Sequence, residues 1–161
     1  MLKDSDNGIA ESLLLMISKE LFDEFSSEKA INYFKNKWKN QLSDSLFWVD
    51  GSGVSRYNMF TPRTIIKILK MIKYEVNWNG IQELFPKSDY FDTSSPYSKL
   101  SGVYSKTGSL RHNHNLSGYI LKQNGGLFFF SIMINHYASS KVDIQKGIFQ
   151  LLEKIKRKLV R

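Results

Sequence analysis

The sequence contains no cysteine among its 161 residues and only three prolines. The absence of cysteine excludes a disulfide scaffold, thiolate zinc sites and a cysteine nucleophile, but it leaves the redox compartment open. The longest apolar runs, at 13–17 and 127–134, fall far short of the roughly 20 residues that cross a bilayer. Because Lys3, Asp4 and Asp6 open the chain where a signal peptide would need an apolar core, we expect any export signal to lie outside this chain.

The composition is that of one globular domain, with 42% hydrophobic and 24% charged residues. The 23 basic residues outnumber the 15 acidic ones, which gives a formal net charge of +8 and a surface that attracts anionic polymers. A nucleic acid has only this charge in its favour, because the aromatic run at 128–130 lies in the middle of a predicted strand with no basic residues interleaved. We therefore expect no nucleic-acid partner and no membrane span.

The first part of the chain has the periodicity of helices. Apolar residues fall on nearly every side of 9–22, which predicts a helix that is buried all round. A second helix is predicted at about 27–42, and Thr61-Pro62 has the pattern of a cap that opens a third. The stretch at 77–100 is predicted to be mostly loop, with one helical turn near 82–85.

The second part has the pattern of strands. Three runs at 102–109, 116–122 and 126–136 are strand-like, and the Asn124-Gly125 pair between the last two is a strong hairpin signal. The third run is apolar on both faces, so we expect it to be central or covered on both sides. A helix at about 140–160 carries one apolar stripe. The predicted fold is α+β, in which helices precede a three-stranded antiparallel β-meander that the long C-terminal helix covers.

Three short motifs could carry chemistry: Ser5-Asp6-Asn7, Asp50-Gly51-Ser52-Gly53-Val54-Ser55-Arg56, and Lys106-Thr107-Gly108-Ser109. Each also has a plain structural interpretation, as a helix cap, a turn and an edge strand respectively. A lysine flanked by hydroxyls offers a cation and O–H donors to a carboxylate. Ser5 and Asn7 stand two residues apart, so that one could pass a proton while the other binds an amide. Acyl transfer at a peptide bond needs these abilities together.

The order and setting of these motifs resemble the serine D-Ala-D-Ala carboxypeptidase/endopeptidase family, the class C low-molecular-mass penicillin-binding proteins. The resemblance runs from Ser5 to the terminal helix and is most specific at 104–110 and in Leu116-Ser117-Gly118-Tyr119. It implies a partial beta-lactamase/transpeptidase-like fold in an enzyme of the periplasm or cell envelope. It also implies cleavage of peptidoglycan stem peptides ending in D-Ala-D-Ala through an acyl-serine intermediate, with no cofactor and with beta-lactams as ligands of the full-length enzyme.

The same resemblance implies a role for each motif residue. Ser5 would relay a proton between the catalytic lysine and the leaving D-alanine, and Asn7 would bind the substrate's backbone amide. Lys106 would supply a positive field beside Ser5. Thr107 and Ser109 would hold the terminal carboxylate, and the Ser109 N–H would be an oxyanion-hole donor.

The remaining motif residues receive supporting roles from the resemblance. Gly108 would let a substrate backbone approach in register. The loop at 50–56 would line or brace the cleft without a chemical step, through Asp50, Ser52, Ser55 and Arg56. We expect Ser5, Asn7, Lys106 and Thr107 to converge on one cleft.

The chain departs from the family at the nucleophile, because the family's Ser-x-x-Lys motif lies well upstream of Ser-x-Asn. The segment Ser26-Ser27-Glu28-Lys29 matches Ser-x-x-Lys, but it follows the Ser-x-Asn motif instead of preceding it. We interpret it as a helix start with Ser26 or Ser27 as the cap. We therefore expect residues 1–161 to be the C-terminal portion of a longer domain, inactive alone. Such a portion would expose apolar surface and self-associate.

Two other interpretations remain at this point. His112 and His114 are predicted to lie on a hairpin turn, but no third ligand is evident, so surface histidines are expected rather than a metal site. The rival to an enzyme is a non-catalytic basic module that binds cell-wall peptide or another anionic polymer.

Overall fold

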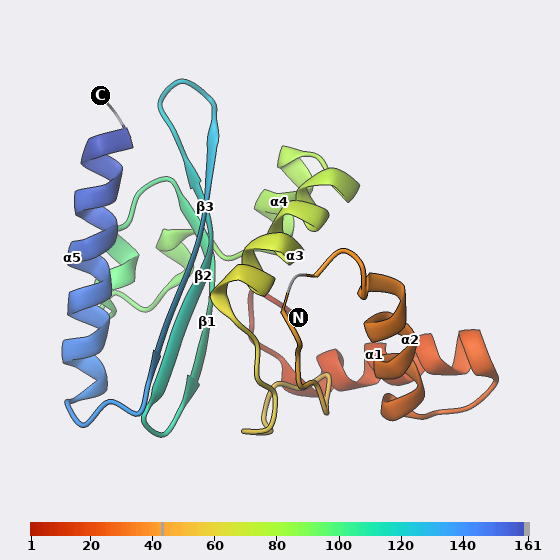
Figure 1. Cartoon of the computed structure of the whole chain (residues 1–161). Coiled ribbons are helices and arrows are strands. Elements are labelled where there is room, and N and C mark those ends of the chain that lie inside the picture. The colour runs from red at the N-terminus through yellow and green to blue at the C-terminus, as the bar shows by residue number, and fades with distance from the viewer. Residues whose placement is uncertain (43, 160–161) are drawn as a thin grey trace. The chain divides into compact units, whose positions relative to one another are not determined.

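The computed structural model describes residues 1–42 and 44–159 (Figure 1). It confirms the predicted α+β class, with helices first, a three-stranded antiparallel sheet next and a long helix last. The chain divides into two units, Met1–Lys67 and a second that begins at Ile68. The boundary falls within one helix.

The first unit contains α1 (Asn7–Phe22) and α2 (Ser27–Trp38), followed by an irregular segment that leads to the start of α3 (Pro62–Glu75). Leu14, Ala30 and Ile31 form its small buried core, with Phe34 and Trp48 packed against them. The cap predicted for α3 is confirmed, since Thr61 Oγ1 accepts a hydrogen bond of 3.1 Å from the Thr64 N–H.

The expectation that α1 is buried all round is wrong. Leu14 and Ser18 are its buried residues, whereas six large apolar side chains are between 36% and 63% exposed: Ile9, Leu13, Met16, Ile17, Leu21 and Phe22. One stripe of α1 packs against α2, and the described residues leave the rest of its apolar surface uncovered. The expectation that the chain exposes apolar surface is thereby confirmed.

The second unit contains α4 (Trp78–Leu84), two short 3-10 helices η1 (Ser88–Tyr90) and η2 (Pro96–Lys99), strands β1 (Val103–Leu110), β2 (Asn113–Leu121) and β3 (Leu127–Asn135), and α5 (Lys141–Leu159). The segment expected to be mostly loop is thus more regular than predicted. Helix α4 is longer than the single turn predicted near 82–85. The Asn77 side chain caps its start by accepting a hydrogen bond from the Gly80 N–H. Val160, included in the predicted last helix, lies outside the described residues.

The three strands form an antiparallel sheet in the order β1-β2-β3. Among the described residues β3 is therefore an edge strand, so of the two expected arrangements, central or covered on both sides, the second is the one that occurs. Its apolar residues are partly covered on both faces: Phe130 packs into the core on one face, while Phe129 contacts the Tyr119 ring on the other. Helices and loops can cover both apolar faces of a strand even when the strand lies at the edge of its sheet.

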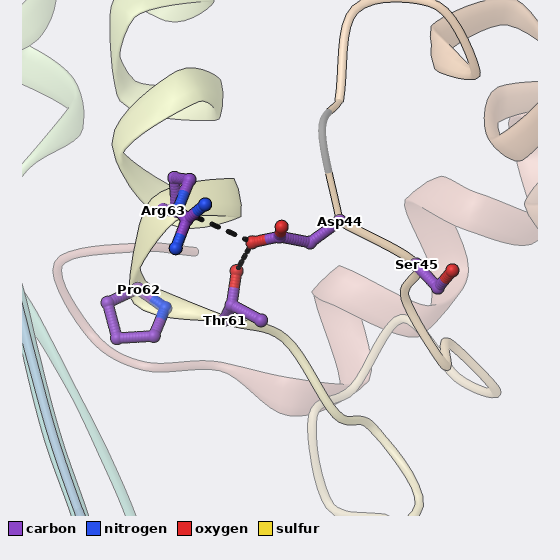
Figure 2. Close-up of a pocket in the computed structure, with 5 residues that line it drawn as sticks. All are labelled: Asp44, Ser45, Thr61, Pro62 and Arg63. Atoms are coloured by element: carbon purple, nitrogen blue, oxygen red, sulfur yellow. Dashed lines mark hydrogen bonds and ion pairs between the residues drawn. The ribbon is translucent and has the colours of Figure 1, made fainter.

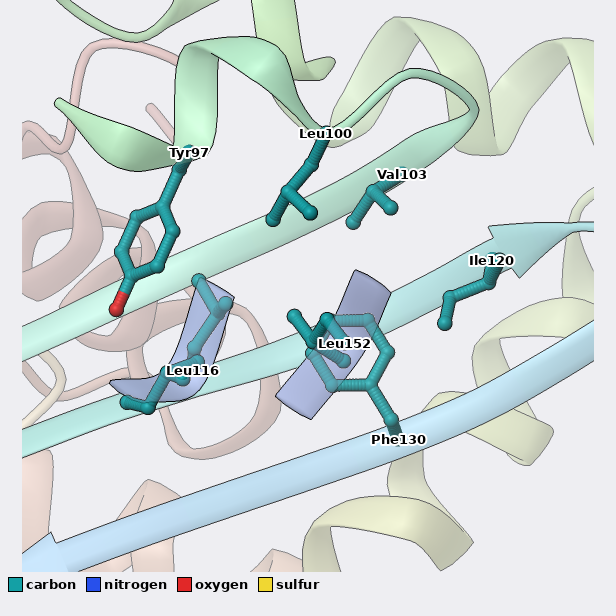
Figure 3. Packing of buried hydrophobic residues seen from close by; sticks show 8 residues of the cluster. Tyr97, Leu100, Val103, Leu116, Ile120, Phe130 and Leu152 are labelled. Atoms are coloured by element: carbon teal, nitrogen blue, oxygen red, sulfur yellow. The ribbon is translucent and has the colours of Figure 1, made fainter. Parts of the chain in front are cut away.

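Helix α5 covers one face of the sheet, where the main core lies (Figure 3). The buried cluster there is Tyr97, Leu100, Val103, Leu116, Ile120, Phe130, Ile148 and Leu152. On the opposite face Tyr119 donates to the Leu69 carbonyl of α3 at 2.9 Å, and Tyr104 accepts from Gln82 of α4 at 2.8 Å. The sheet is thus held between α5 and the α3–α4 segment, and β1 displays a different set of side chains to each.

The turn between β1 and β2 is shorter than the predicted gap at 110–115, because only Arg111 and His112 lie outside the strands. His114 belongs to β2 and is 0% exposed, so its interpretation as a surface histidine is wrong. The period-two pattern explains the burial, since His114 shares a face with the core residues Leu116 and Ile120.

Gly118 of β2 lies unusually close to β1. A Cβ at this position would be 2.1 Å from the Tyr104 carbonyl oxygen and 2.6 Å from the Ser105 Cα, which are backbone atoms that cannot move aside separately. We predict that Gly118→Ala forces the two strands apart and lowers the free energy of unfolding by about 2 kcal/mol or more. Denaturant unfolding measures it, with Gly147→Ala in α5 as control. That Cβ meets no atom within 4 Å, so the control should gain about 0.5–1 kcal/mol.

The exposed apolar surface of α1 predicts self-association of this chain. Met16 is the most exposed of its apolar residues, at 63%. Met16→Lys should therefore shift the sedimentation profile toward the monomer and reduce binding of an apolar dye. A monomer with no dye binding at high concentration for the unaltered chain would contradict the prediction.

Candidate active site

The first motif lies at the start of α1. Asp6 is the helix cap, and its Oδ1 accepts a 2.8 Å hydrogen bond from the Ile9 N–H. The motif thus caps the helix as predicted, but the capping side chain is that of Asp6 and not that of Ser5 or Asn7. Ser5 and Asn7 are both exposed, and Ser5 has a left-handed backbone with φ of 55°. A non-glycine residue in this conformation costs about 1 kcal/mol or more, and Asp23, His112 and His136 share it.

The second motif forms a turn organised by the Asp50 carboxylate. Asp50 accepts from the Gly53 N–H at 2.6 Å, the Ser55 N–H at 2.9 Å and the Asn58 side-chain amide at 3.0 Å. Burial alone would raise the pKa of Asp50, but these donors outweigh it and hold the pKa below its ordinary value. Ser52 also donates to Asp50, while Arg56 is exposed. The turn is therefore a rigid element.

Glu11 of α1 fastens this turn to the helix, a role that the sequence did not reveal. Its carboxylate accepts from the Gly51 N–H at 2.7 Å and the Ser52 N–H at 3.0 Å, and from the Ser27 hydroxyl of α2. Gly51 is required here, since a Cβ would lie 2.9 Å from the Ala10 carbonyl oxygen. The loop braces α1 directly behind its first turn, while its place beside a cleft stays a prediction.

The third motif lies on β1, where alternation separates its side chains. Lys106 faces the α3–α4 side in one row with Ser117 and Ser131, whose hydroxyls are 2.9 Å apart. Burial lowers the pKa of Lys106 below its ordinary value, so the ammonium gives up its proton more readily. Its Nζ donates to the Thr107 carbonyl at 2.7 Å, which brings the cation to the outer edge of the strand.

The outer edge of β1 has backbone groups available for a ligand. The Ser105 N–H points outward, because it donates to the Pro86 carbonyl at 3.0 Å. By the two-residue period of a strand, the peptide groups of Thr107 and Ser109 point the same way. No described residue pairs with the backbone N–H groups of these two, and Gly108 between them is exposed. An extended peptide could therefore pair with this edge.

Thr107 and Ser109 present their side chains on the α5 face of the sheet. Thr107 is half-buried, while Ser109 is exposed and its Oγ lies 2.7 Å from His114 Nδ1. The two hydroxyls proposed to hold a carboxylate thus lie on one side of β1, and the Lys106 side chain leaves from the other. Ser5 and Asn7 belong to the first unit and the Lys106 motif to the second, so their convergence stays a prediction.

The structure favours the helix-start interpretation of Ser26-Ser27-Glu28-Lys29. The Ser26 hydroxyl caps α2 by accepting from the Lys29 N–H at 3.3 Å, and Lys29 Nζ pairs with the Glu24 carboxylate. A nucleophilic serine would need the lysine amine rather than its backbone N–H as its partner. Ser26 and Lys29 therefore have structural roles in this chain.

A surface pocket of the first unit is lined by none of the motif residues (Figure 2). Asp44, Ser45, Thr61, Pro62 and Arg63 line it. The Asp44 carboxylate accepts from the Thr61 hydroxyl and pairs with Arg63 at 3.8 Å, so its charge is compensated within the wall. We assign this pocket to the start of α3 and give it no chemical role.

Within residues 1–42 and 44–159, no three or more histidine, cysteine, aspartate or glutamate side chains gather where they could hold a metal ion. No helix in the same part of the chain is both long and apolar enough to cross a membrane.

Comparison with known proteins identifies relatives across the whole chain. The model of the D-Ala-D-Ala carboxypeptidase 3 (S13) family matches residues 1–155. The D-alanyl-D-alanine carboxypeptidase DacB of Haemophilus influenzae is 29% identical over 153 residues, which cover 89% of this chain and 32% of that protein. The penicillin-sensitive carboxypeptidase A of Dictyostelium discoideum is 31% identical over 125 residues, covering 65% of this chain and 22% of that protein. The chain thus spans a third or less of these curated relatives.

Solved structures agree with this. The crystal structure of penicillin-binding protein 4 of Haemophilus influenzae has a TM-score of 0.79 at 25% identity and covers 100% of this chain, which matches 40% of that one. A TLA-1 beta-lactamase, at 17% identity and a TM-score of 0.59, shares the fold over 99% of this chain and 64% of its own. The expected beta-lactamase-like fold is confirmed.

The bonds of Glu11 lead to a prediction for the first unit. Glu11→Ala removes the acceptor of the Gly51 and Ser52 N–H groups, so these amides should exchange their hydrogens faster and the unfolding free energy should fall by about 1–3 kcal/mol. Hydrogen exchange at the two amides measures the effect. Glu20→Ala, on the same helix and exposed, is the matched control. Equal protection of both amides in the two variants would contradict the bracing role.

Proposed function

Because the chain belongs to the D-Ala-D-Ala carboxypeptidase 3 (S13) family, we propose that it is the C-terminal portion of a serine peptidase that cleaves peptidoglycan stem peptides ending in D-Ala-D-Ala. The reaction would pass through an acyl-serine intermediate and would also accept beta-lactams, which acylate the same serine. The enzyme would act in the periplasm or cell envelope, where this substrate lies. The chain by itself would be inactive.

The observation that carries the proposal is the outer edge of β1. Four consecutive residues, 106–109, supply the Lys106 cation, the outward N–H groups of Thr107 and Ser109, and an exposed hydroxyl. A peptide strand ending in a carboxylate matches this set, because its backbone pairs with the edge and its terminal charge meets the hydroxyls and the cation. The Ser109 N–H would donate to the oxyanion that develops at the attacked carbonyl.

Ser5 and Asn7 would complete the site from the start of α1. Ser5 would pass a proton to the leaving D-alanine and Asn7 would bind the substrate's amide. The cap of α1 supports such roles, since Asp6 supplies it and neither Ser5 nor Asn7 is needed for capping. The loop at 50–56 would keep α1 in place behind these two residues.

The nucleophile would come from a Ser-x-x-Lys motif in a segment preceding this chain in the full-length protein. The capping geometry of Ser26 supports this, because its hydroxyl is already engaged with the Lys29 backbone. The proposal therefore predicts an in-frame Ser-x-x-Lys and an export signal upstream in the gene.

Labelling with a fluorescent penicillin tests the proposed function. The full-length protein should be labelled, and Lys106→Ala should slow its acylation on the order of a hundredfold or more, because the variant loses the cation at the site. Lys99→Ala is the matched control, an exposed lysine on η2 whose loss should leave the rate unchanged. A full-length protein that binds stem peptide without being labelled or cleaving it would indicate the non-catalytic module instead.

Ser26→Ala separates the two assignments of the nucleophile. In the full-length protein it should acylate at the normal rate and lose only about 1 kcal/mol of stability from the missing cap. Covalent labelling of the isolated 161-residue chain that disappears in Ser26→Ala would show that this chain carries its own nucleophile.

A further inference from the structure

A buried histidine stands directly behind the exposed Ser109. His114 of β2 is the register partner of Ser109 and is 0% exposed. Its Nδ1 lies 2.7 Å from Ser109 Oγ, and its Nε2 lies 2.9 Å from the Tyr97 hydroxyl. The three side chains therefore form a continuous hydrogen-bonded line from the core to the strand edge.

The buried end of this line fixes where its protons lie. Tyr97 is 1% exposed and lies at one end of the buried cluster drawn in Figure 3. Among the described residues its hydroxyl has one hydrogen-bond partner, His114 Nε2. If Nε2 carried a hydrogen, the phenol hydrogen would have no acceptor in the core, which is costly for a buried group. The satisfied arrangement has the phenol donating to a bare Nε2.

The hydrogen positions at the Ser109 end of the line follow from those at the Tyr97 end. A neutral histidine with a bare Nε2 carries its hydrogen on Nδ1, which then donates to Ser109 Oγ. Burial, with a smaller contribution from the positive charge of Lys141, lowers the pKa of His114 and supports the neutral form. Because the Ser109 oxygen accepts from behind, its own hydrogen is left to point outward.

We propose that Tyr97 and His114 act as positioning residues that fix the Ser109 hydroxyl as a hydrogen-bond donor toward the carboxylate of a ligand at the outer edge of β1. The carboxylate ligand rests on the proposed function, whereas the direction of the relay does not. A serine held in this way has little rotational freedom to lose on binding, and it discriminates between a terminal carboxylate and a neutral terminal amide.

The direction of the relay can be measured in the unaltered 161-residue chain. In a sample labelled with ¹⁵N at histidine, the nitrogen resonances distinguish a protonated from a bare ring nitrogen. At neutral pH we expect His114 to have a protonated Nδ1 and a bare Nε2, with the signals assigned by their loss in His114→Asn. A protonated Nε2 would overturn the proposal, because Ser109 would then be the donor to the ring and not to a ligand.

The consequence for the ligand is tested in the full-length protein with two peptides, one ending in a free carboxylate and one in an amide. His114→Phe and Ser109→Ala should each raise the KM for the carboxylate peptide on the order of tenfold and leave the amide peptide nearly unchanged. The double variant should match Ser109→Ala, since His114 has no further effect on the ligand once the hydroxyl that it orients is gone. His112→Phe, an exposed histidine at the adjacent turn, should alter neither KM.

The outcomes separate the two proposals. Equal loss for both peptides in His114→Phe, or additive effects in the double variant, would overturn the positioning role. If the full-length protein cleaves neither peptide, the proposed function fails, and the nitrogen resonances still decide the relay. The same measurement remains decisive if His114→Phe does not fold.

Discussion

The pairing of β1 with β2 determines which groups of the 106–109 segment can meet a ligand. Alternation along β1 sends Lys106 to one face and the two hydroxyls to the other, while the outward peptide groups lie on the edge between them. A shift of one residue would exchange every one of these positions. Gly118 keeps the strands close enough for this register, and the Ser109–His114 bond occurs within it. The proposed chemistry therefore depends on a backbone approach that only glycine permits.

Much of the fold could be predicted, because its signals are local. The strand alternation, the Asn124-Gly125 turn and the single stripe of α5 each reflect a repeating pattern in neighbouring residues. The burial of α1 and the place of β3 could not be predicted in the same way. An apolar residue in the sequence indicates a tendency to be covered, but whether something covers it depends on which elements lie beside it.

The candidate site, too, could be predicted where its signals are local and not where they are distant in sequence. The types of residue at 106–109 indicate carboxylate chemistry without any structure, whereas their partners are distant in sequence. Glu11 meets Gly51 forty residues away, and Tyr97 reaches His114 from a segment expected to be loop. A stricter use of the period-two rule would have placed His114 on the buried face with Leu116. His114 falls in the predicted gap at 110–115, whereas only Arg111 and His112 lie outside the two strands.

The short contact of Pro86 and Lys87 with β1 has a further consequence, which concerns association. An exposed edge strand can pair with the edge of another molecule and so nucleate aggregates, and the risk grows with the length of the edge that is open. Here the bond from the Ser105 N–H to Pro86 and the bridge between Lys87 and Tyr104 close the first half of β1. The open stretch offers the edge of another molecule the same few N–H groups that the proposed peptide would use. A bound peptide would therefore also close this edge against a second copy of the chain.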